Sequence, residues 1–118
     1  MNSVLAMRIS AVIGFCAVAL GAFGAHGLKE LLGRFQTTDI WHTAALYHLV
    51  HSVVLLFVAS REPLRKAAWW LFLIGIVVFS GSLYLLAVTN LRWLGAITPL
   101  GGLCLLGGWL ALGFPPKR

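Results

Sequence analysis

Four long apolar stretches divide the sequence, and short polar segments separate them. They cover residues 9–25, 41–60, 67–89 and 94–114. At a rise of about 1.5 Å per residue, a helix of about 20 residues crosses the roughly 30 Å hydrocarbon core of a bilayer. Backbone groups in lipid must pair within their own segment, so the pattern predicts helices. We expect an all-α fold, a bundle of four transmembrane helices that forms a single transmembrane domain over residues 1–118.

A different pattern follows the first stretch, between Leu28 and Ile40. Apolar residues there recur at a spacing of three and four, and they are Leu28, Leu31, Leu32 and Phe35. Charged residues fall mainly on the other side. This predicts a short amphipathic helix at the membrane interface. Thr37, Thr38 or Asp39 would then cap the second span.

The composition supports a membrane protein. Of the 118 residues, 60% are hydrophobic and 10% are charged, whereas a soluble domain carries about 25% charge. The net charge is +6, but the basic residues are scattered between apolar stretches. No basic face could follow the phosphates of a nucleic acid, so we expect no nucleic-acid partner.

Basic residues also indicate the orientation, because Lys and Arg near span ends favour the cytoplasm. One side of the predicted topology holds Arg8, Arg61, Arg65, Lys66, Lys117 and Arg118, and the other holds Lys29, Arg34 and Arg92. Both termini are therefore expected in the cytoplasm. Tryptophan prefers the membrane boundary. We expect Trp41 and Trp93 at the outer boundary, and Trp69, Trp70 and Trp109 toward the inner one.

In this topology, polar side chains of all four spans collect in the outer half of the membrane. The candidate polar site consists of His26, Tyr47, His51, Ser80, Ser82 and Thr98. Ionisable residues inside a membrane are candidates for function. They also form hydrogen bonds between helices, and both interpretations remain open. No span supplies a Cys or carboxylate that would complete a metal shell around the histidines, so we expect no metal and no cofactor.

Small residues mark faces where helices can approach closely. The predicted packing residues are Gly14, Ala17, Gly21 and Gly24 in the first span, and Gly101 and Gly102 in the fourth. Pro99 lies inside the fourth span and cannot donate a backbone hydrogen bond, so a kink is expected there.

Four motifs in this order resemble a known family. They are Gly21-Ala22-Phe23-Gly24-Ala25-His26, Tyr47 with His51, Phe79-Ser80-Gly81-Ser82-Leu83-Tyr84, and Thr98-Pro99-Leu100-Gly101-Gly102. Together they resemble the YgdD-like inner membrane family, also called domain of unknown function 423 and related to transmembrane protein 256. The resemblance implies a multi-spanning protein of the bacterial inner (plasma) membrane without an established activity. His42 and His48 lie outside these motifs, which weakens the idea of a metal cluster built on them.

Two functions compete, and a third is weaker. The first is an accessory protein that packs with itself, with membrane lipids or with a larger membrane complex. The alternative is a carrier or transporter of a small lipophilic or cationic solute that uses the polar cluster. An intramembrane enzyme would pair Ser82 with His51, but no carboxylate inside the spans could orient the histidine. We therefore expect that the protein is not an enzyme.

Overall fold

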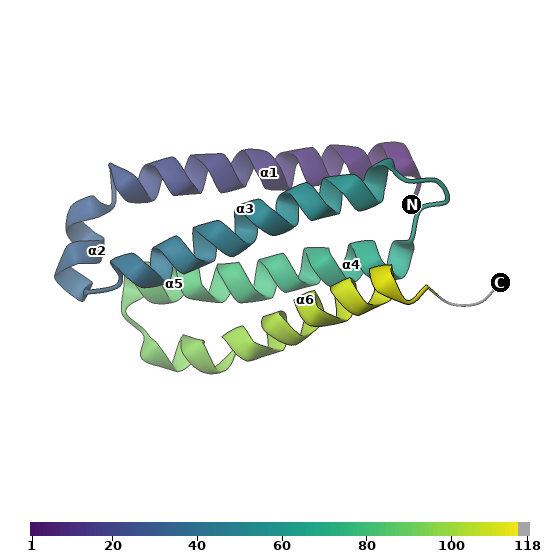
Figure 1. Ribbon diagram of the computed structural model, residues 1–118. Coiled ribbons are helices and arrows are strands. Elements are labelled where there is room, and N and C mark those ends of the chain that lie inside the picture. Colours follow the sequence, from purple (N-terminus) through teal and green to yellow (C-terminus); the bar gives the residue numbers. More distant parts are fainter. Residues whose placement is uncertain (116–118) are drawn as a thin grey trace.

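The computed structural model describes residues 1–115, which contain helices and no strand (Figure 1). Four helical spans are long and apolar enough to cross a membrane. The elements are α1 (Ser3–Ala25), α2 (Lys29–Phe35), α3 (Thr38–Ser60), α4 (Lys66–Gly75), the π-helix η1 (Ile76–Ser80), α5 (Gly81–Thr89), the 3-10 helix η2 (Arg92–Ala96) and α6 (Thr98–Gly113). The third span joins α4, η1 and α5, and the fourth joins η2 and α6. The predicted all-α membrane fold is confirmed.

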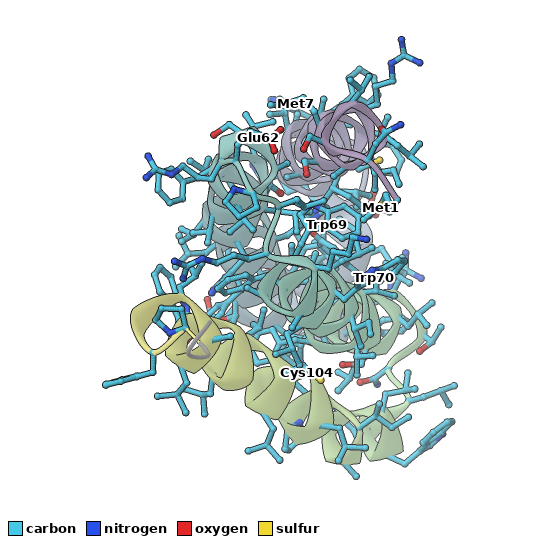
Figure 2. All side chains as sticks on the ribbon, turned by 90° about the vertical axis from the view of Figure 1, so that its right-hand side faces the viewer. Met1, Met7, Glu62, Trp69, Trp70 and Cys104 are labelled. Atoms are coloured by element: carbon cyan, nitrogen blue, oxygen red, sulfur yellow. The ribbon has the colours of Figure 1, made fainter. Side chains whose placement is uncertain are left out.

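The spans stand side by side in a row, in the order α1, α3, third span and fourth span (Figure 1). α1 packs mainly on α3, whereas α6 packs on α4 and η1. α3 also contacts α4, η1 and α5, so it lies between α1 and the third span. Helices α1 and α6 therefore form opposite ends of the row, and Figure 2 shows the same order from the side where α1 begins and α6 ends.

The first helix begins earlier than predicted. It starts at Ser3, six residues before the expected position 9, because the side chain of Asn2 accepts a hydrogen bond from the Leu5 N–H (2.8 Å) and caps the helix. Arg8 consequently lies inside α1, with an exposed side chain. A long aliphatic stem lets such a charged group extend to the membrane surface.

The predicted amphipathic segment is the short helix α2, which contacts α3, α5 and α1. Only Leu32 of its residues is buried. The chain then turns through Gln36, which has a φ of 57°. Thr37 precedes α3 at the cap position, but its hydroxyl donates to the carbonyl of Ala87 in α5 (2.7 Å). Of the three predicted caps, Thr37 thus links two spans and does not cap its own helix by a side-chain hydrogen bond.

The third span contains a π-helix that the sequence did not predict. η1 (Ile76–Ser80) carries Phe79 and Ser80 and packs against α3 and α6. The Ser80 hydroxyl donates to the carbonyl of Ala44 in α3 (2.8 Å). Single π-turns inside α-helices are rare and occur frequently at functional sites.

The prediction that Pro99 kinks the interior of the fourth helix is wrong. The fourth span begins as the 3-10 helix η2, and Ile97 separates it from α6. Pro99 lies in the first turn of α6 and not in the interior of a continuous α-helix. A missing N–H costs little there, because the first N–H groups of a helix have no helical partner.

Trp69, in the first turn of α4, is completely buried among the helices (Figure 2). Its indole donates to the hydroxyl of Ser10 (3.0 Å), and Ser10 donates to the carbonyl of Ala6 (2.7 Å). Leu55 and Phe72 belong to the same core. This buried polar link joins α1 and α4 outside the outer half, where the polar side chains were expected to collect.

Trp41 is also buried, in the first turn of α3. Its indole donates to the carbonyl of Leu20 (3.0 Å), and a Cβ added at Gly24 would overlap its ring. Gly24 thus makes room for an interhelical hydrogen bond near the end of α1. In contrast, Trp70, Trp93 and Trp109 are exposed.

The glycines differ sharply in how much space surrounds them. A Cβ at Gly101 would lie 2.7 Å from the Cα of Phe79, so this glycine lets α6 approach the backbone of η1. A Cβ at Gly14 or Gly102 would make only ordinary contacts, and one at Gly21 would meet nothing within 4 Å. Ala17 is buried. Gly75 and Gly108, which were not in the predicted packing set, also make close approaches.

These distances predict opposite effects of one substitution at two glycines. Gly101→Ala should destabilise the protein by about 1–3 kcal/mol, because the new methyl group would overlap the backbone of η1. Gly21→Ala should leave stability unchanged or raise it, because the methyl group has space and alanine favours a helix. Unfolding with sodium dodecyl sulfate in mixed micelles would measure both. Equal stability of the two variants would contradict the close approach at Gly101.

Candidate functional site

A groove opens between α3 and α6, over the π-helix η1. Its volume is about 520 Å³. The walls include Tyr47, His51, Phe79, Pro99, Leu106 and Trp109. We call this feature the Tyr47–Trp109 groove. Leu106 and Tyr47 are 62% and 40% exposed, so the groove opens on the outer surface of the helices, where lipid surrounds a membrane-spanning protein.

His51 lies at the base of this groove, close to the middle of α3, and is only 6% exposed. Its Nδ1 is 2.8 Å from the carbonyl oxygen of Tyr47, and its Nε2 is 3.1 Å from the indole nitrogen of Trp109. A carbonyl only accepts and an indole N–H only donates. His51 therefore carries its proton on Nδ1 and accepts at Nε2, which makes it a neutral imidazole in this structure.

Aromatic rings surround the histidine. Tyr47 stacks on His51 with ring centroids 5.9 Å apart, and the ring centroids of Tyr47 and Phe79 are 4.6 Å apart. On the other side, Trp109 meets Phe72 edge to face at 5.5 Å. Such contacts add to the energy of apolar burial. They hold His51 and Trp109 in a fixed arrangement between α3 and the fourth span.

The six residues of the predicted polar site do not form one cluster. Tyr47 and His51 share the Tyr47–Trp109 groove, but His26 is exposed at the end of α1. Ser80 faces the carbonyl of Ala44.

Ser82 and Thr98 form a separate pair. Their hydroxyl oxygens are 2.6 Å apart, and Ser82 donates to the carbonyl of Phe79 (2.9 Å). The structure therefore places Ser80, Ser82 and Thr98 in hydrogen-bonded contacts between helices. Tyr47 and His51 line the groove, and His26 lies apart from both.

His48 was set aside in the sequence analysis, but it makes the most extensive polar contact among the spans. It is 5% exposed. Its Nε2 donates to the carbonyl of Ile13 in α1 (2.9 Å), and its Nδ1 is 2.9 Å from the hydroxyl of Tyr84 in α5. Ala44, His48 and Ser52 recur at a spacing of four, and this stripe of small and polar residues could have indicated a face turned toward other helices.

The described residues do not gather ligands for a metal ion. Within residues 1–115, no group of three or more His, Cys, Asp or Glu could hold one. His26 and His42 are exposed whereas His48 is buried, so these three histidines do not share a site. Cys16 and Cys104 are both free and half-buried.

The chain is similar to a family of membrane proteins. The family described as "Protein of unknown function (DUF423)" matches residues 20–102. The UPF0382 membrane protein YwdK of Bacillus subtilis is 43% identical, over 88% of this chain and 89% of its own. The UPF0382 inner membrane protein YgdD of Escherichia coli is 40% identical, over 92% of this chain and 86% of its own. No solved structure matches.

The contacts predict that His48 matters more for stability than His26. His48→Ala should destabilise the protein by about 1–3 kcal/mol, because Tyr84 and the Ile13 carbonyl would lose a buried partner. His26→Ala should change stability by less than about 0.5 kcal/mol, since His26 is exposed. Unfolding in mixed micelles would compare the two variants. A larger effect of His26→Ala would contradict the contacts described for His48.

Proposed function

The chain belongs to the DUF423 family, whose relatives are membrane proteins without a stated activity, and on that premise we propose that it is a non-enzymatic accessory protein. It would pack in the membrane with a second copy, with lipid or with a larger membrane complex. The observation that supports this proposal most is that its buried polar side chains are hydrogen-bonded within the protein. Within residues 1–115, no buried side-chain nitrogen or oxygen lacks a hydrogen-bond partner.

An intramembrane enzyme of this kind would need a nucleophile and a base that are hydrogen-bonded to each other. Ser82 and His51 are the pair that an enzyme would use. Ser82 donates to Phe79 and contacts Thr98, whereas His51 binds Tyr47 and Trp109. The hydrogen bonds of these two residues do not join them. Their contacts are those expected of helix packing.

The row arrangement favours lateral association. α1 and α6 lie at opposite ends of the row (Figure 1), and each carries large apolar side chains that are exposed. Phe15 of α1 is 74% exposed and Leu103 of α6 is 65% exposed. A soluble protein would cover such residues, but a membrane protein offers them to lipid or to another helix.

A carrier of a small lipophilic solute is the second candidate, and the Tyr47–Trp109 groove is the observation that favours it. A volume of about 520 Å³ is within the range of small-molecule sites. Its walls are largely apolar, and Tyr47 and His51 supply a few polar atoms. Coupling of transport to protons through His51 would require breaking its hydrogen bond with Trp109, so this groove suits a neutral solute better than a proton-driven one.

We also infer that both termini face the cytoplasm. Arg61, Arg65 and Lys66 lie where α3 ends and α4 begins, on the side of the molecule where α1 begins, and Arg8 lies in the second turn of α1. Lys29, Arg34 and Arg92 lie at the other end. Lys117 and Arg118, which the sequence adds to the first group, lie outside the described residues. An excess of Lys and Arg favours the cytoplasmic side.

Native mass spectrometry of protein gently extracted from its membrane tests the two functional candidates together. An accessory protein should appear with a stoichiometric protein partner or as a discrete homo-oligomer. A carrier should instead retain a small molecule. Leu106→Trp should expel that molecule by filling the groove, whereas Leu110→Trp should not, because Leu110 is also exposed on α6 but does not line the groove. A bare monomer without protein, lipid or solute would contradict both candidates.

The orientation can be tested with single cysteines, after Cys16 and Cys104 have been replaced by alanine. In intact spheroplasts, a membrane-impermeant maleimide should label Gly33→Cys, which is exposed in α2 with open space around it. Pro115→Cys, at the other end, should react only after permeabilisation. The reverse pattern would overturn the proposed orientation.

A further inference from the structure

A second cavity lies at the end of the molecule that carries the termini, which Figure 2 views directly. Its volume is about 380 Å³. The lining includes Phe57, Val58, Arg61, Glu62, Arg65 and Leu112. We call it the arginine cavity. It therefore joins the last turns of α3 and α6 and the loop that follows α3, at the level where a span leaves the membrane.

Arg65 is held in the cavity by the end of α6. Its Nη1 donates to the carbonyl oxygen of Leu112 (3.1 Å). The last carbonyls of a helix have no partner within the helix, so a guanidinium is a favourable partner for them. A guanidinium has five N–H donors in a planar fork, and this contact uses one of them. Further donors of Arg65 remain for an anion.

Arg61 is held by an aromatic ring. Its Cζ lies over the ring of Phe57, 5.6 Å from the ring centroid, which is within the range of a cation–π contact. The one acidic residue of the lining, Glu62, accepts a hydrogen bond from the Ser3 hydroxyl of α1 (2.7 Å). The cavity therefore contains two guanidinium groups and one carboxylate, and that carboxylate is already bound to another helix.

From this geometry we propose that the arginine cavity binds the phosphate of an anionic phospholipid. Two guanidinium forks are suited to bind phosphate oxygens. Basic pockets between membrane helices bind such head groups on the side where the charges lie. The apolar part of the lining belongs to spans that continue into the membrane, and Phe57 is 53% exposed. The acyl chains of a bound lipid would lie along this surface, which a free phosphate cannot use.

The proposed function names lipid only as one of three kinds of contact, whereas this inference names one lipid class and its site, and it does not depend on that function. A lipid held by Arg61 and Arg65 would be retained whether or not the protein has a protein partner or a solute in the Tyr47–Trp109 groove. The two cavities share no lining residue. Variants of one cavity can therefore be examined without altering the lining of the other.

The test is equilibrium binding of dansyl-labelled phosphatidylglycerol to the delipidated full-length protein in neutral detergent, followed by energy transfer from tryptophan. Unlabelled phosphatidylglycerol should compete strongly, and phosphatidylcholine with the same chains should compete weakly. Arg61→Gln should weaken binding by about fivefold, as should Arg65→Gln, because one basic residue near an anionic lipid contributes about 1 kcal/mol. Arg61→Gln is the safer variant for folding, since the contact of Arg61 is to a side chain.

Lys66→Gln is the matched control, because it removes the same charge one residue after Arg65 without lining the cavity. It should bind the labelled lipid nearly as well as the unaltered protein. An equal loss in Lys66→Gln and in the arginine variants would overturn the proposal, as it would indicate attraction by general charge. Displacement of the lipid by millimolar inorganic phosphate would also overturn it, because the acyl chains would then contribute nothing.

Discussion

The absence of water inside a bilayer is the constraint on which this structure depends, because a polar side chain there must find its partner within the protein. Helix α3 satisfies much of this requirement. His48 contacts α1 through Ile13 and α5 through Tyr84, and His51 accepts from Trp109 of α6. The Ser80 hydroxyl of the third span donates to the Ala44 carbonyl of α3. Side-chain hydrogen bonds of α3 thus connect it to the other three spans.

The central position of α3 explains the shape of the molecule. The spans form a row and not a closed bundle, so α1 and α6 each leave an apolar face uncovered. The row also produces both cavities, since α6 packs on the third span and approaches α3 only through side chains such as Trp109. Glycine allows α6 to approach the third span closely, where Gly101 lies against the backbone of η1. A saturated interior with open outer faces is consistent with a protein that acts through lateral contacts.

Much of the fold followed from hydropathy and turn signals. The number of spans and the short helix after the first were predicted from apolar stretches and from spacing. The boundaries were less accurate, since the Asn2 cap extends α1 toward its N-terminus. Pro99 indicated an interruption of the fourth span, but its position in the first turn of α6 depends on η2, which the sequence did not indicate. The π-helix at Ile76–Ser80 was missed because nothing in the local sequence distinguishes it from an α-helix.

The sequence by itself determined that this chain crosses a membrane, because the hydropathy of a segment is a property of its own residues. It also named Tyr47 and His51 together, as one motif and as members of the candidate polar site. Only the tertiary structure decided which partners these side chains have. The rotation of each helix about its axis places His48 and Trp69 inside, leaves His26 outside and brings Trp109 to His51. That rotation depends on the packing of all the spans together, so no single segment encodes it.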